Sequence, residues 1–243
     1  MTAPPVARRL VTAEEVARLR ARIERIERTN RVGSDAPVLP APAAIAGLLP
    51  GGGLRTGSVY ALDRSMPLLL ALLGEPSRAG TWCAAIGVPE LGVEAARAAG
   101  AELERLVLIP RPAERWLSVV ATVAEVMGLV AVRPGGRVRD QDAARLAARL
   151  RERGTVLLVQ GAWPQAEARI EVGELRWSGL GDGHGHLQRL EATLGVSPRQ
   201  AAGTHRDRVL LLGEPPTPGA LEATGGDSAA DTPSPPLLLR ATG

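Results

Sequence analysis

The stretch Leu48-Leu-Pro-Gly-Gly-Gly-Leu-Arg-Thr-Gly-Ser-Val-Tyr60 decides the fold that we expect for this chain. An apolar segment leads into a glycine turn, and an apolar run of strand length follows at residues 58–62. Similar runs occur at 81–86, 105–109, 129–132 and 155–160, and segments with helical periodicity separate them at 67–73, 91–99, 113–127 and 140–153. Strands that are apolar throughout and alternate with helices predict a parallel sheet with both faces covered.

The pattern changes after Gln160. Residues 168–177, 186–194 and 208–212 resemble strands, and a glycine-rich turn at 179–185 joins the first two. Such a succession is typical of antiparallel strands added at one edge of a sheet. The predicted fold class is therefore α/β, with a mainly parallel central sheet flanked by helices and an antiparallel extension at the C-terminal edge.

Segments of different character flank this domain. We expect residues 1–40 to form an N-terminal helix and a linker, 41–213 to form the domain, and 214–243 to be a disordered tail rich in proline and glycine. The helix is predicted over 12–30, and a narrow apolar stripe on it consists of Val16, Leu19, Ile23 and Ile26. A stripe on an otherwise charged helix packs on one surface, either its own domain or a second chain.

The composition excludes several kinds of chemistry. All 29 basic residues other than histidine are arginines, so a Schiff base, a lysine general base and a phosphate-binding lysine are excluded. The net charge is only +3, and the scarcity of Lys, Phe, Asn and Tyr indicates GC-rich codons rather than a nucleic-acid partner. A single cysteine, Cys83, cannot form an internal disulfide, and it is most simply a small core residue.

Neither a signal peptide nor a membrane span is predicted. The longest uncharged apolar run, at residues 67–74, is too short to cross a bilayer. We therefore expect a soluble, cytoplasmic protein.

The order of these elements resembles the nucleotide-binding core of RecA-type recombinases. The glycine turn before the strand at 58–62, Pro89-Glu90 after the strand at 81–86, and Gly100-Ala-Glu-Leu-Glu-Arg-Leu-Val-Leu-Ile-Pro110 match that family in sequence order. The resemblance covers about residues 41–212. It implies a RecA-like core with a phosphate site where the first strand meets the following helix.

The chain departs from the RecA family at its nucleotide positions. A phosphate loop needs glycines, a lysine and a metal-binding hydroxyl in the pattern G-x-x-x-x-G-K-[ST]. The corresponding residues are Asp63, Arg64, Ser65, Met66, Pro67, Leu68 and Leu69, and Arg133 replaces the carboxylate that would order Mg²⁺ at a strand end. An aspartate at this turn would also repel a triphosphate. We expect neither ATP hydrolysis nor tight ATP binding, with no catalytic residue, no cofactor and no metal.

Degenerate RecA-like chains of this length resemble the ImuA and ImuA-prime accessory proteins of SOS mutagenesis. The resemblance implies a non-catalytic adaptor in translesion DNA synthesis and DNA repair after DNA damage. Its partners would be an ImuB-like inactive Y-family polymerase homologue and, indirectly, an error-prone C-family polymerase. By the same resemblance, the stripe of Val16, Leu19, Ile23 and Ile26 is the candidate contact to RecA or to a second copy. The alternatives are an ATP-dependent enzyme of the same fold and a simple DNA-binding module.

Residues 133–153 are rich in arginine. The segment contains seven arginines and only three acidic residues, and the glycines near Arg133 give the loop freedom to contact phosphates. The candidate DNA contacts are Arg133, Arg137, Arg139, Arg145, Arg149 and, on the next loop, Trp163. A solvated arginine face, and a tryptophan packed under the sheet edge, are the competing interpretations.

The turn at 179–185 holds three residues that could be taken for metal ligands, Asp182, His184 and His186. They lack a fourth ligand and helical spacing, so solvent-exposed turn residues are the favoured interpretation.

Overall fold

The computed structural model describes residues 36–181, 184–200 and 203–213, and the side chains of 180–187 are not described. Two short strands, β1 (Val38–Leu39) and β2 (Leu54–Arg55), pair antiparallel around helix α2 (Ala43–Ala46). The main sheet has the order β10-β9-β8-β3-β7-β6-β4-β5. The other elements are β3 (Val59–Leu62), α3 (Met66–Arg78), β4 (Cys83–Ile86), α4 (Val93–Ala98), β5 (Leu106–Ile109), α5 (Trp116–Val123), β6 (Leu129–Val132), α6 (Asp140–Arg153), β7 (Val156–Gln160), β8 (Ala168–Gly181), β9 (His184–Pro198) and β10 (His205–Leu212).

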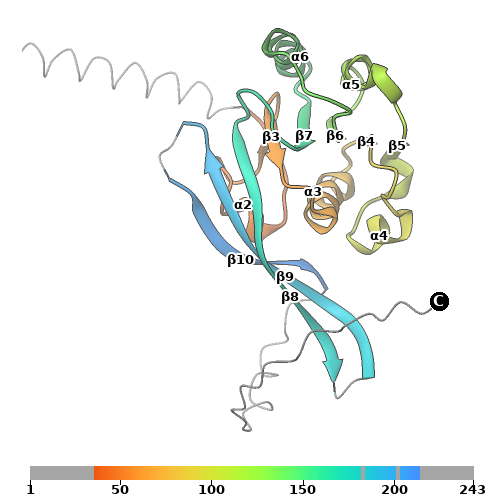
Figure 1. The fold of residues 1–243 in the computed structure, drawn as a ribbon, viewed down its shortest axis with the longest axis vertical. Coiled ribbons are helices and arrows are strands. Elements are labelled where there is room, and N and C mark those ends of the chain that lie inside the picture. Colours follow the sequence, from red (N-terminus) through yellow and green to blue (C-terminus); the bar gives the residue numbers. More distant parts are fainter. Residues whose placement is uncertain (1–35, 182–183, 201–202, 214–243) are drawn as a thin grey trace, which may run out of the picture. The chain divides into compact units, whose positions relative to one another are not determined.

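The strands from β8 to β5 in this order are parallel, and the predicted fold class is confirmed. β3 pairs parallel with both β7 and β8, whereas β9 pairs antiparallel with β8 and with β10. Figure 1 shows the long β8–β9 hairpin beside the short parallel strands. The architecture is the one that the resemblance to RecA-type proteins led us to expect.

The sheet separates two apolar layers because side chains alternate between its faces. Tyr60 and Leu62 pack with α3 and α4 on one face, whereas Val59 and Ala61 pack with α5 and α6 on the other (Figure 1). Strands β3, β4, β6 and β7 are buried at every position, which explains their uninterrupted aliphatic sequences. Both faces must be covered for such strands to be stable.

Several element boundaries differ from those expected. α3 continues to Arg78 through Pro76, because the backbone angle of proline suits a helix and costs only one N–H bond near the helix end. The helix expected at 113–127 begins as a 3-10 turn, Ala113–Arg115, and α5 ends at Val123. Ala113 has a positive φ of 52°, which prevents a regular helix from starting there. Within the described residues, no helix combines the length and apolar content of a membrane span.

Candidate functional site

The turn between β3 and α3 occupies the expected position of a phosphate loop. β3 ends at Leu62 and α3 begins at Met66, so only three residues connect them. The Ser65 hydroxyl accepts a hydrogen bond from the Leu68 N–H at 3.4 Å, and Pro67 contributes no N–H. Leu68 and Leu69 lie fully buried in the core. The turn therefore lacks the converging N–H groups that hold phosphates.

Asp63 in this turn is tied to β8. Its side-chain oxygen Oδ2 accepts a hydrogen bond from the Val172 N–H at 2.9 Å, and its Oδ1 lies 3.9 Å from the Arg169 guanidinium. Its own N–H donates to the Ile170 carbonyl at 3.1 Å. This role was not visible in the sequence, because β8 lies more than 100 residues away. Asp63 therefore anchors β8, the strand that carries the antiparallel β9 and β10, to the end of β3.

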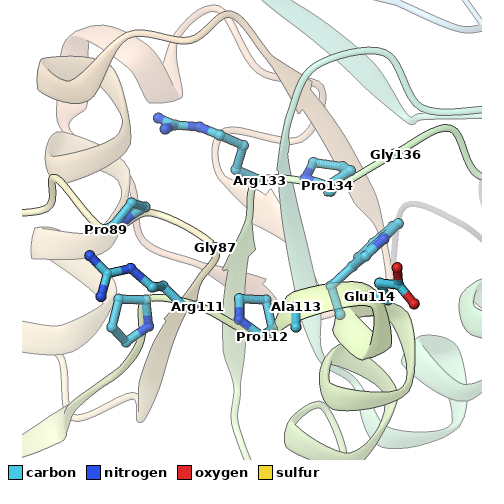
Figure 2. Close-up of a pocket in the computed structure, with 12 residues that line it drawn as sticks. Gly87, Pro89, Arg111, Pro112, Ala113, Glu114, Arg133, Pro134 and Gly136 are labelled. Carbon is cyan, nitrogen blue, oxygen red and sulfur yellow. The ribbon is translucent and has the colours of Figure 1, made fainter.

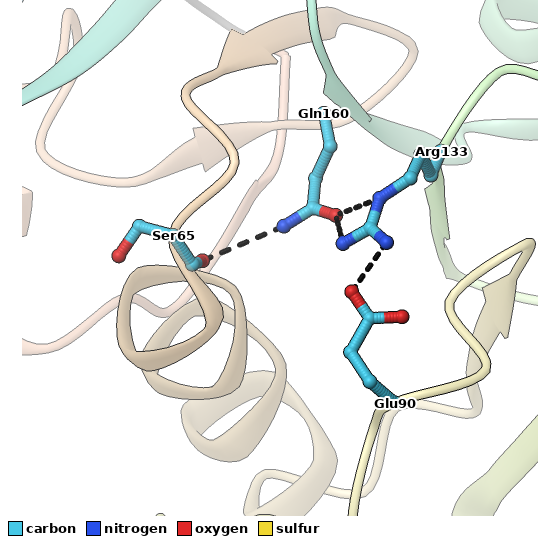
Figure 3. Close-up of polar contacts among 4 residues, drawn as sticks. All are labelled: Ser65, Glu90, Arg133 and Gln160. Atoms are coloured by element: carbon cyan, nitrogen blue, oxygen red, sulfur yellow. Dashed lines mark hydrogen bonds and ion pairs between the residues drawn. The ribbon is translucent and has the colours of Figure 1, made fainter. Parts of the chain in front are cut away.

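A polar network lies beside the turn and joins four segments (Figure 3). The Arg133 guanidinium donates from Nε and Nη2 to Gln160 Oε1 at 3.0 and 2.8 Å, and its Nη1 forms an ion pair with Glu90. Gln160 Nε2 donates to the Ser65 carbonyl at 3.5 Å. The ends of β6 and β7, the loop after β4 and the start of α3 are thereby connected.

Burial makes this network structurally significant. Gln160 is only 1% exposed, and the Arg133 side chain is 20% exposed. The backbone N–H of Glu90 and the Arg133 guanidinium hold the pKa of the Glu90 carboxyl below its usual range. Arg133 is thus satisfied by internal partners, and a cation stands where Mg²⁺ would need a carboxylate ligand. No group of acidic, histidine or cysteine residues suited to a metal occurs in the part of the chain that the structure describes.

A cavity of about 670 Å³ lies next to the network, at the carboxyl ends of β4, β5 and β6 (Figure 2). The chain leaves β4 toward the α4 face and leaves β6 toward the α6 face, and ligands of α/β proteins often bind at such a divergence. Prolines 89, 110, 112 and 134 make its walls rigid, and Arg111 and Glu114 lie on opposite sides in Figure 2. Gly87 is required here, since a Cβ would lie 2.6 Å from the Arg133 carbonyl oxygen.

The structure places the candidate DNA contacts in different surroundings. Arg137 and Arg139 are exposed on the β6–α6 connection, and Arg149 is exposed on α6. Arg145 is also exposed, with its guanidinium 3.8 Å from Asp142. Arg133 differs from these four because the network engages it, so the set expected from the sequence is not one uniform surface.

Trp163 is 7% exposed and packs in the apolar layer of α5 and α6. Of the two interpretations of this tryptophan, the structure has the packed one, and its ring is not available for stacking on a base. Cys83 is fully buried, as expected, and burial raises the pKa of its thiol to about 12.

Other candidate residues cannot be placed. The stripe of Val16, Leu19, Ile23 and Ile26 lies outside the described residues, as does the segment 214–243. Asp182 also lies outside them, and the side chains of His184 and His186 are not described.

Comparisons with known proteins find similarity over the central part of the chain. A family described as the MT3502 N-terminal domain matches residues 47–165. The uncharacterized protein Rv3395c of Mycobacterium tuberculosis is 35% identical over 133 residues, which are 53% of this chain and 65% of the relative. The chain thus spans less than two thirds of that protein's length. The mycobacterial relative and the family match together fit an actinobacterial family.

Two solved structures are similar at low sequence identity. The flagellar accessory protein FlaH from Methanocaldococcus jannaschii is 12% identical, with a TM-score of 0.42 over 66% of this chain and 87% of FlaH. SulA from Pseudomonas aeruginosa is 20% identical, with a TM-score of 0.35 over 42% of this chain and 96% of SulA.

Proposed function

We propose that this chain is a non-catalytic adaptor that acts through protein contacts. The observation that carries the proposal is the closed phosphate position: a three-residue turn replaces the loop, and Arg133, Gln160, Glu90 and Ser65 satisfy one another beside it. An ATP-dependent enzyme would need donors and a metal ligand at this position. The fold supplies a rigid sheet with connections that are free to contact other proteins.

The resemblance to the ImuA and ImuA-prime proteins supports a role in SOS-induced translesion DNA synthesis. The partner would be an ImuB-like inactive Y-family polymerase homologue, through which an error-prone C-family polymerase is reached. RecA or a second copy of the chain is the proposed contact of the N-terminal stripe. The similarity to a mycobacterial protein is consistent with the actinobacterial branch of this family.

Nucleotide binding tests the closed site. The full chain is titrated with ATP and Mg²⁺ in a calorimeter, and a RecA-type ATPase serves as the positive control. We expect no saturable binding up to about 1 mM, because each lost phosphate contact and the lost metal remove binding energy. Submillimolar ATP binding, or an ATPase activity that a change in residues 63–69 abolishes, would overturn the proposal.

Co-purification tests the adaptor role. The chain is expressed with the Y-family polymerase homologue, and Leu19→Asp is compared with Ala21→Asp, which lies on the opposite side of the expected helix. We expect Leu19→Asp to abolish co-purification or self-association and Ala21→Asp to preserve it, since a buried charge is costly in an apolar contact. If Leu19→Asp preserves both, the stripe packs within its own chain. If the unmodified chain fails to co-purify, the adaptor proposal is wrong.

A further inference from the structure

A second cavity, of about 700 Å³, lies at the amino ends of the parallel strands, whereas the closed phosphate position lies at their carboxyl ends. Its walls are the start of β3, the last turn of α6, the loop before β8 and the residues after β9. The amino ends of neighbouring parallel strands lie side by side here, whereas the residues of the polar network lie at the carboxyl ends of the same strands. The cavity is therefore a separate surface that the nucleotide argument does not use.

Four arginines line this cavity; one, Arg55, is paired with Glu167, and the other three come from two distant segments. Arg151 and Arg153 come from the last turn of α6, and Arg199 follows β9. Within the residues that the structure describes, none of the three guanidinium groups has an ion-pair or hydrogen-bond partner. Cations at a helix end offset the helix dipole, which accounts for the two on α6 but not for Arg199.

The acidic residues at the cavity do not neutralise these arginines. Glu167 is engaged by Arg55, with 3.0 Å between the charged atoms, and their side chains are only 14% and 18% exposed. Glu152 is the other carboxylate of the lining, and it has no ion pair among the described residues. The cavity therefore carries excess positive charge beside the ion pair of Arg55 and Glu167.

The local backbone fixes the main-chain positions of these arginines. Gly57 has a φ of +74°, and a Cβ there would lie 2.9 Å from the Arg151 Cα, so the turn before β3 packs directly against α6. Gly154, with a φ of +68°, ends α6 in the left-handed conformation, which favours glycine. The Arg199 N–H donates to the Glu167 carbonyl at 2.9 Å, which fixes the main chain of Arg199 beside the ion pair of Arg55 and Glu167.

The remaining lining indicates a peptide rather than a nucleic acid. Thr56, Ser58, Gln165 and Gln200 supply uncharged donors and acceptors that suit peptide groups. Among the described residues that line it, none has an aromatic side chain, whereas single-stranded nucleic acids are commonly held by aromatic stacking. Arginine binds carboxylates in bidentate geometry, so free guanidinium groups suit glutamate or aspartate side chains.

We propose that this cavity binds an acidic peptide segment of a protein partner. The inference rests on the proposed adaptor function only for the existence of such a partner, because the preference of the cavity for carboxylates can be measured without one. A failure of co-purification in the preceding experiment and a failure of peptide binding are thus separate results.

The test is fluorescence anisotropy with the full chain at roughly physiological salt. The probe is a fluorescein-labelled peptide of alternating glutamate and glycine, and the comparison probe has glutamine in place of glutamate. The cavity variant is Arg151→Ala/Arg153→Ala/Arg199→Ala. The matched control, Arg115→Ala/Arg206→Ala/Arg208→Ala, removes the same charge from exposed arginines elsewhere. We expect binding of the acidic peptide to weaken by about tenfold or more in the cavity variant and by less than about twofold in the control.

Three results would overturn the proposal. Equal losses in both variants would mean attraction by net charge alone, and equal binding of the glutamine peptide would mean that carboxylates are not read. Tighter binding of a single-stranded oligonucleotide that the cavity variant loses would mean a nucleic-acid site. Circular dichroism checks that the variants are folded. If the cavity variant unfolds, Arg199→Glu takes its place, and it is expected to weaken peptide binding by charge reversal at an exposed position after β9.

Discussion

Arg133 stands where a nucleotide-binding sheet of this kind would carry a carboxylate. Its guanidinium contacts Gln160 and Glu90, so it connects the end of β6 to the end of β7 and to the loop after β4. Gln160 is almost fully buried and depends on Arg133 for the donors to its side-chain oxygen. Arg133 therefore has a structural role at the ends of these strands.

We predict that Arg133→Met destabilises the fold by about 1–3 kcal/mol, because the buried Gln160 oxygen is left without a donor. Urea denaturation measures the change. Arg137→Met is the control, since Arg137 is exposed and should change stability by less than about 0.5 kcal/mol. Equal stability of the two variants would show that the network contributes nothing to folding.

Tyr60 is the only tyrosine, and its burial raises the pKa from 10.0 to about 12. The folded state thus favours the neutral phenol, so the stability that this group contributes is complete below about pH 10 and is lost as the pH rises toward 12. We predict that phenolate absorbance develops with a midpoint near pH 12 while the chain stays folded. A midpoint near 10 in a folded chain, checked by circular dichroism, would contradict the burial of Tyr60.

At the scale of elements, aliphatic periodicity predicted most of the fold. The runs at 129–132 and 140–153 coincide with β6 and α6, because both are bounded by sharp changes of polarity. The N-terminal boundary of α5 was missed, because the positive φ of Ala113 has no signal in an alanine. Residues 63–69 predicted a turn without the phosphate-loop pattern, which remains a prediction about nucleotide binding. The partners of Arg133 could not be predicted, because Gln160 lies 27 residues away on another strand.

Gly74 in α3 shows how packing between elements overrides helix propensity. Alanine in place of an interior helical glycine ordinarily stabilises by about 1 kcal/mol. A Cβ at Gly74 would overlap the backbone carbonyl of Ala99, just after α4. We predict that Gly74→Ala destabilises by about 1–3 kcal/mol in thermal or urea unfolding. Gly136→Ala is the control, because a Cβ at Gly136 meets no atom within 4 Å. If Gly74→Ala instead stabilises the protein, the segment after α4 can move away from the new methyl group.

At the scale of the whole molecule, the two ends of the parallel strands have different properties. At the carboxyl ends of the strands, internal polar contacts close the phosphate position. At their amino ends lies the cavity with unpaired arginines. In an ATPase of this architecture the carboxyl ends would carry the chemistry. The adaptor that we propose would use both ends of these strands as contact surfaces.

Direct DNA contact is a second function that we propose for the molecule, because Arg137, Arg139, Arg145 and Arg149 are exposed. Each phosphate contact on single-stranded DNA adds about 0.7 to the slope of log affinity against log salt. We predict that Arg137→Gln/Arg139→Gln lowers this slope by about 1.4 in anisotropy titrations, because two contacts are lost. Arg133→Gln should leave the slope unchanged, because its guanidinium is engaged by Gln160 and Glu90. An unchanged slope in the double variant would identify these arginines as a solvated surface, and an equal loss with Arg133→Gln would mean that the network opens on DNA.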